Sequence, residues 1–131
     1  MAGDFVYLQA NGDAAANYEY QYGGAVGLGF SGNGFEDASE ADIGLVNCQS
    51  AVTNAPGTIN FTLPEYGGST FTKQGTGTTG NFNTNSLTGS LFVGTFYWSW
   101  NSTTPITSIT MGLNGGTNFV VGTTFTLYGL D

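Results

Sequence analysis

Hydrophobic and polar side chains alternate along several stretches of this chain with the period of two that is typical of β-strands. In residues 58–63, Ile59, Phe61 and Leu63 fall on one face, and the threonines and the asparagine between them fall on the other. Pro64 follows and is expected to end the run, because proline lacks the amide hydrogen that a strand ladder requires. The pattern predicts one half-buried strand.

The C-terminal region repeats this alternation. Apolar residues occupy every second position of residues 109–113, and the Asn-Gly-Gly sequence of residues 114–116 suits the positive φ angles of a tight turn. Apolar residues resume at positions 119–121, so we expect a hairpin. After a glycine, residues 123–130 alternate again and are expected to form a last strand.

Residues 91–100 are apolar on both faces of a predicted strand. One face carries Leu91, Val93 and Tyr97, and the other carries four aromatic rings. A strand with two apolar faces is expected at the centre of a sheet or beneath a partner subunit. The rings of the second face belong to Phe92, Phe96, Trp98 and Trp100.

The N-terminal third has shorter patterns. Residues 5–10 and 18–22 are each predicted to form a strand, and the second strand would show three tyrosines on one side. We expect residues 1–22 to act as an N-terminal arm or an edge strand. Residues 36–42 suit one short helical turn, and residues 75–88, which are polar and rich in glycine and threonine, suit a long surface loop.

Composition supports an all-β fold. The 131 residues include 22 glycines, and the chain is also rich in threonine and asparagine. All three residue types disfavour helices, because glycine loses backbone entropy there and the other two compete for local hydrogen bonds. A chain of this length is expected to fold as one domain. We therefore expect residues 1–131 to form a single antiparallel β-sandwich with little or no helix.

Charge narrows the range of functions. The chain carries nine acidic residues, one lysine, no arginine and no histidine, for a formal net charge of −8. Such a chain repels phosphate backbones, so we expect no nucleic-acid partner. It also lacks histidine, the side chain that most often transfers protons at neutral pH. We expect no enzymatic activity and no cofactor, and we expect the single cation, Lys73, to be exposed and to protect a strand edge.

Cys48 is the only cysteine, so the chain cannot form an internal disulfide. Its apolar neighbours indicate a small residue in a partly buried strand rather than a nucleophile, since no histidine is present to hold a thiolate. No stretch is long and apolar enough to span a membrane, and no secretory signal precedes the first predicted strand. We expect a protein that is made in the cytoplasm and has no membrane partner.

Four carboxylates lie within seven residues: Glu36, Asp37, Glu40 and Asp42. A solvated acidic loop or an electrostatic patch between subunits would explain them. Clustered oxygen ligands also bind Ca²⁺, but the spacing matches no calcium-binding loop, so this cluster is only a weak calcium candidate. A carboxylate pair is also the machinery of glycoside hydrolysis, although no glycosidase motif is present.

Residues 27–32 match the three-glycine dinucleotide-binding pattern letter by letter. That pattern requires a helix directly after it, whose N-terminus binds the pyrophosphate. Residues 33–35 carry no helix signal, so we interpret the match as accidental.

Two groups of aromatic residues are candidates to bind a partner or to stack on sugar rings. Tyrosines alternate in residues 18–22, and two tryptophans alternate in residues 98–100. Aromatic residues at strand spacing also occur in cores and subunit interfaces, so both interpretations stay open. The candidate partner-binding residues are Phe5, Tyr7, Tyr18, Tyr20, Tyr22, Trp98 and Trp100.

The C-terminal sequence resembles a terminal module found in many virion proteins of tailed bacteriophages. The resemblance covers residues 106–113 and 116–130, with an Ile-x-x-Ile start, a turn, and the ending Asn-Phe-x-x-Gly-Thr-x-Phe-x-Leu-Tyr-Gly followed by a hydrophobic residue. It implies a β-sandwich of jelly-roll type in a virion surface component. It implies no catalytic residue.

Components that carry this module are head decoration (cement) proteins or tail or fibre domains, and they are commonly homotrimers. The small size of the chain favours a protein of the virion head that bridges subunits of the major capsid protein, with residues 1–22 as a gripping arm. The leading hypothesis is therefore a non-enzymatic, homotrimeric decoration protein on the virion surface, made in the host cytoplasm. The alternatives are a receptor- or glycan-binding module of a tail, in which Trp98 and Trp100 stack on a cell-surface glycan, and a carboxylate-based hydrolase.

Overall fold

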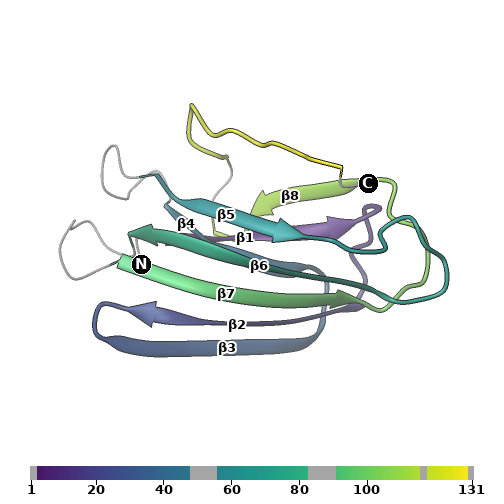
Figure 1. Ribbon diagram of the computed structural model, residues 1–131, viewed down its shortest axis with the longest axis horizontal. Coiled ribbons are helices and arrows are strands. Elements are labelled where there is room, and N and C mark those ends of the chain that lie inside the picture. The colour runs from purple at the N-terminus through teal and green to yellow at the C-terminus, as the bar shows by residue number, and fades with distance from the viewer. Residues whose placement is uncertain (1–2, 48–55, 83–90, 116–117, 130–131) are drawn as a thin grey trace.

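The computed structural model describes residues 3–47, 56–82, 91–115 and 118–129. Within these residues every regular element is a β-strand, and the strands form two antiparallel sheets that pack against each other (Figure 1). The predicted all-β fold and antiparallel β-sandwich are therefore confirmed. In chain order the strands are β1 (Gly3–Ala10), β2 (Tyr18–Val26), β3 (Gly29–Ala38), β4 (Ala41–Asn47), β5 (Thr58–Thr62), β6 (Lys73–Phe82), β7 (Leu91–Trp100) and β8 (Ile109–Leu113).

The smaller sheet has the strand order β4-β1-β8, and the larger sheet has the order β3-β2-β7-β6-β5. The chain passes from one sheet to the other after β1, β3, β4 and β7. β4 approaches the larger sheet most closely and packs against β6 and β7. The jelly-roll arrangement implied by the resemblance stays a prediction.

β7 lies between β2 and β6 at the centre of the larger sheet, as its two apolar faces predicted. Its four aromatic rings are buried in the sandwich, and Trp98 is the largest fully buried side chain among the described residues. The side chains of Leu91, Val93 and Tyr97 lie on the opposite face and remain about half exposed. β7 therefore supplies much of the core and leaves an apolar strip on the outside of the sheet.

β5 confirms the strand predicted near Pro64. Ile59 and Phe61 are half-buried against the core, and the residues that alternate with them are exposed. β5 is an edge strand of the larger sheet.

The surface loop predicted for residues 75–88 is wrong over residues 75–82, which form most of β6 between β7 and β5. Glycine is needed here because aromatic rings from β7 occupy the space that side chains would take. A Cβ atom at Gly75 would lie 2.7 Å from Cε2 of Trp98, and one at Gly77 would collide with the Phe96 ring. Residues 83–88 of the predicted loop lie outside the described residues.

The N-terminal strands are confirmed, but the predicted arm or edge strand is wrong. β1 lies between β4 and β8, and β2 lies between β3 and β7, so both are interior strands. Two tyrosines of β2 are buried, and the hydroxyl of Tyr18 accepts a 2.8 Å hydrogen bond from the backbone amide of Ala10. Apolar burial and this cross-sheet hydrogen bond hold the segment within the molecule.

The helical turn predicted for residues 36–42 is also wrong. This segment ends β3 and begins β4, and Asp37 adopts a positive φ of 53° that no right-handed helix contains. Strand pairing takes its place, since Ala38 pairs with Tyr18 and the start of β4 pairs with β1. β4 ends at Asn47, so the strand position predicted for Cys48 lies outside the described residues.

Lys73, predicted to be exposed, is instead almost completely buried, at 1% exposure. Its ammonium group donates hydrogen bonds to three backbone carbonyl oxygens, those of Gly68 at 2.7 Å, Phe71 at 3.0 Å and Thr103 at 3.3 Å. These carbonyls belong to the loops that precede β6 and follow β7. The only basic side chain of the protein therefore fastens two loops at one end of the sandwich.

The predicted C-terminal hairpin and last strand are wrong for the described residues. β8 pairs with β1, whereas residues 118–129 form no strand. The segment instead folds back on itself, because Thr123 donates a backbone hydrogen bond to Val120 and the rings of Phe119 and Phe125 meet edge to face at 5.0 Å. Figure 1 shows this segment in yellow on the β8 side of the molecule.

Candidate functional site

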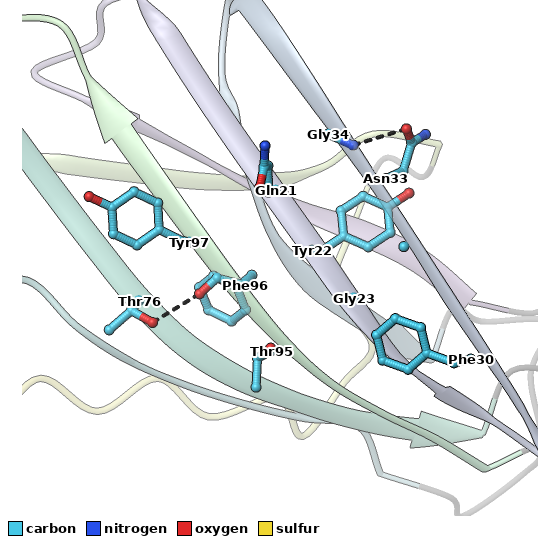
Figure 2. Close-up of a pocket in the computed structure, with 11 residues that line it drawn as sticks. Gln21, Tyr22, Gly23, Phe30, Asn33, Gly34, Thr76, Thr95, Phe96 and Tyr97 are labelled. Atoms are coloured by element: carbon cyan, nitrogen blue, oxygen red, sulfur yellow. Dashed lines mark hydrogen bonds between the residues drawn. The ribbon is translucent and has the colours of Figure 1, made fainter.

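A hollow of about 530 Å³ lies on the outer face of the larger sheet and is the candidate site of the described structure (Figure 2). Its lining comes from β2, β3, β6 and β7, four consecutive strands in the order of that sheet. The side chains that define its walls are Gln21, Phe30, Thr76, Thr95 and Tyr97.

Strand register brings these side chains together from distant parts of the sequence. Gln21 pairs with Tyr97 across β2 and β7, and Tyr97 pairs with Thr76 across β7 and β6. Paired residues of antiparallel strands lie on the same face with Cβ atoms about 5 Å apart. An amide, a phenol and a hydroxyl therefore line up across the outer face of the sheet.

Glycines form the floor of the hollow. Gly23 pairs with Gly32 of the edge strand β3, and Gly34 pairs with Gln21, whose Cγ atom lies 2.8 Å from the position of a Cβ atom at Gly34. A Cβ atom at Gly32 would meet backbone rather than a side chain. The ring of Phe30 leans over Gly23, where a Cβ atom would come within 3.1 Å of its Cζ atom. The hollow thus lies between the rings of Phe30 and Tyr97 and has bare backbone at Gly32.

The polar groups of the hollow are uncharged and largely available. Within the described part of the chain, the side chains of Gln21, Thr95 and Tyr97 make no hydrogen bond. The hydroxyl of Thr76 donates to the Phe96 carbonyl at 3.1 Å, which leaves its oxygen free to accept. The lining contains no acidic or basic residue. This chemistry suits a neutral, hydroxyl-rich ligand better than an ion.

The acidic cluster does not form a metal site. Glu36 and Asp37 are exposed at the end of β3, Glu40 is half-buried, and Asp42 points into the protein. No group of three or more histidine, cysteine, aspartate or glutamate residues in the described ranges is arranged to hold a metal ion. The weak calcium candidate is therefore wrong, because Glu36 and Asp37 are exposed at the end of β3 whereas Asp42 is buried in β4.

Asp42 is a buried carboxylate with neutral partners. It accepts a 2.6 Å hydrogen bond from the side-chain amide of Asn114 and a hydrogen bond from the hydroxyl of Tyr20. Burial raises the pKa of Asp42, and burial followed by the charge of Asp42 raises the pKa of Tyr20. Burial also raises the pKa of Glu40, and the nearby Asp42 adds to this effect. The two hydrogen bonds of Asp42 tie β4 to β2 and to Asn114, the residue directly after β8.

Mild acidification is expected to stabilise the fold through these two carboxyl groups. The pKa values of Asp42 and Glu40 are raised above their ordinary 3.8 and 4.5, so the folded state binds protons more tightly than the unfolded state. Their destabilising effect is complete above the folded pKa values and decreases as the pH falls through them. Asp13, whose hydrogen bonds lower its pKa below 3.8, stays ionised above about pH 5 and does not oppose this trend.

The test is a series of thermal unfolding curves between about pH 7 and pH 5, a range that stays above the isoelectric point of about 4.1. The melting temperature should rise as the pH falls, and Asp42→Asn should flatten the rise. A rise of equal size in Asp42→Asn would remove Asp42 as its cause.

Most of the candidate partner-binding aromatic residues lie in the core. Tyr18, Tyr20, Trp98 and Trp100 are buried, and Nε1 of Trp100 donates a 2.7 Å hydrogen bond to Asp13. The remaining candidates, Phe5, Tyr7 and Tyr22, are half-buried, and the rings of Phe5 and Tyr22 contact each other at 4.9 Å. Sugar stacking by the two tryptophans is therefore wrong, because the faces of β2 and β7 that carry these rings both point inward.

Gln21 and Tyr97 of the hollow are the outward neighbours in sequence of Tyr20 and Trp98. The sequence pattern places Tyr97 on the same face as Leu91 and Val93, but it does not single out Gln21, Phe30, Thr76 or Thr95. Alternation does place the first and last of these on the outer faces of β2 and β7. Their meeting point depends on which strands pair and in what register, and the sequence alone does not give that.

No helix within the described ranges has the length and apolar character needed to cross a membrane. No protein-family model, curated protein or solved structure matches this chain.

Proposed function

We propose that this chain is a non-enzymatic structural protein of a phage virion, namely a head decoration protein that bridges subunits of the major capsid protein. Two features support the proposal. The resemblance of residues 106–113 and 116–130 to a virion module suggests that the chain is part of a phage particle. The exposed apolar side chains of the C-terminal segment, residues 118–129, suggest that it binds a partner.

The C-terminal segment is the observation that carries the proposal. Val121 and Leu127 are 101% and 88% exposed, and Tyr128 is 79% exposed, although each has a large apolar surface. Large apolar side chains that stay exposed on a folded domain commonly mark a protein interface, because binding removes them from water. Residues 124–129 belong to no sheet of their own copy, which leaves their backbone open to pairing with a partner strand.

Charge limits the kind of partner. The one basic side chain, Lys73, is buried against backbone carbonyls, so the described surface presents acidic but no basic side chains. Such a surface favours a partner with apolar or basic groups and disfavours nucleic acid. The outer surface of a capsid shell is protein and can present such groups.

Leu127→Glu is expected to weaken attachment to phage heads by at least about tenfold, since burying one unpaired carboxylate costs well over 1.4 kcal/mol. Leu28→Glu is the matched control, because Leu28 is 109% exposed at the β2-β3 turn and lies outside the C-terminal segment. Both substitutions lie on the surface and should leave the circular dichroism spectrum unchanged.

The measurement is co-sedimentation with heads from which the protein has been removed, combined with sedimentation velocity for the proposed homotrimer. Equal attachment of the two variants would argue against an interface at the C-terminal segment. A wild-type chain that stays monomeric and binds no heads would overturn the proposal. Attachment to tails alone would favour the alternative position on a tail or fibre.

A further inference from the structure

We infer that the hollow on the outer face of the larger sheet binds a neutral oligosaccharide through the rings of Tyr97 and Phe30 and the amide of Gln21. This inference does not depend on the virion assignment, since it rests on the chemistry of the hollow. The core tryptophans take no part in it.

The two rings supply apolar contact surface. Tyr97 is 48% exposed and Phe30 is 81% exposed, whereas the other rings of β7 are almost fully buried. They border the hollow, and Figure 2 shows the ring of Phe30 beside Gly23, which the ring covers. A sugar ring offers flat C–H surfaces that pack on aromatic faces, and the bare backbone at Gly32 allows it to approach the edge of the sheet closely.

The polar groups supply hydrogen bonds of the kind that sugar hydroxyls need. Gln21 offers both a donor and an acceptor, and the hydroxyls of Thr95 and Tyr97 offer one donor each together with acceptor lone pairs. None of these three side chains has a hydrogen-bond partner among the described residues. They therefore do not have to break an internal hydrogen bond to bind a ligand.

The same lining argues against charged ligands. It contains no cation that could hold a phosphate, sulfate or carboxylate group, and the formal net charge of −8 repels anions. It also contains no carboxylate to attract a cation. A ligand rich in hydroxyl groups and free of charge fits this site, and the open shape of the hollow suits one face of an oligosaccharide chain.

The test is a nuclear magnetic resonance titration of the ¹⁵N-labelled protein with maltohexaose, cellohexaose and chitohexaose, with sialyllactose as an anionic comparison. We expect at least one neutral hexasaccharide to bind with a millimolar dissociation constant and to shift the side-chain amide signals of Gln21. The backbone signals of Gly23 and Thr95 should move with them. Sialyllactose should cause no shift at these positions.

Substitutions separate the contributions. Tyr97→Ala should weaken binding by about tenfold through loss of the ring, whereas Tyr97→Phe should keep most of the affinity. Thr95→Val should weaken binding by losing a hydroxyl without changing shape. Tyr66→Ala is the matched control, because Tyr66 is 58% exposed and lies outside the hollow, and it should leave binding unchanged.

Four results would overturn the inference. The first is the absence of shifts with every neutral probe at tens of millimolar, and the second is stronger binding of sialyllactose. The third is a set of shifts outside the hollow, and the fourth is an equal loss of affinity in Tyr66→Ala. Leu127→Glu should bind the same probes as the wild type, so failure of the capsid interface and failure of this site are distinguishable.

Discussion

Lys73→Met is expected to destabilise the fold by about 3 kcal/mol. Methionine keeps a long apolar stem in the same buried space but removes the ammonium group and its three hydrogen bonds to Gly68, Phe71 and Thr103. The loops before β6 and after β7 would lose the group that joins them.

Two effects oppose each other at this position. Burial of an ammonium group without a carboxylate partner costs free energy, and replacement by an apolar side chain recovers that cost. Hydrogen bonds to a charged donor, however, contribute about 1.5–3 kcal/mol each, and three of them converge here. We expect the hydrogen bonds to outweigh the desolvation cost, because the substitution leaves three carbonyl groups in partly buried positions without their donor.

Urea unfolding measures the change in free energy. Gln74→Met is the matched control, since Gln74 is exposed and lies next to Lys73 on β6. The control should change stability by less than about 0.5 kcal/mol. A Lys73→Met protein as stable as this control would mean that the three hydrogen bonds contribute nothing net.

Gly75→Ala is expected to destabilise the protein by about 3 kcal/mol through overpacking. The added methyl group would meet the indole of Trp98, including Cε2 at 2.7 Å and Cζ2 at 2.9 Å. Trp98 is completely buried and cannot move aside without disturbing the core. Gly80→Ala on the same strand is the control, because its methyl group would meet Thr58 and Phe92 only at 3.6 and 3.7 Å.

The double variant Gly75→Ala/Trp98→Phe makes this prediction sharper. Phenylalanine lacks the indole atoms that the new methyl group would strike, and it removes an indole N–H that is buried without a hydrogen-bond partner. The double variant should therefore be more stable than the sum of the two single changes predicts, by at least about 1 kcal/mol. Additive losses in a urea double-mutant cycle would contradict the assigned contact.

The sequence predicts best those strands whose buried and exposed faces can be recognised from their own alternation of apolar and polar residues. β5 and β7 show their burial in their own alternation, so the sequence identifies both and indicates the central place of β7. β6 shows no such alternation, because its glycines have no side chains, and the reason for these glycines is seen only in the structure, where the rings of Trp98 and Phe96 occupy the space beside them. A glycine that makes room for a neighbouring ring and a glycine in a loop look the same in sequence.

Lys73 and the C-terminal segment were mispredicted for related reasons. A lone lysine is ordinarily exposed, and its burial here depends on carbonyl groups of two loops, one of them 30 residues away. The C-terminal residues alternate like a strand, but alternation does not say whether an edge is available within the same copy. The hollow could not be predicted for the same reasons: its residues are distant in sequence, and they meet only because four strands pair in a particular order.

The edge strand β3 has a consequence for the behaviour of the protein in concentrated solution. Its residues are exposed almost throughout, it contains neither lysine nor proline, and its only charged residues, Glu36 and Asp37, lie near its C-terminal end. Along the rest of this edge, mutual repulsion between like-charged molecules acts against edge-to-edge aggregation. The acidic surplus of the chain therefore acts as a colloidal stabiliser, and salt that screens it weakens that protection.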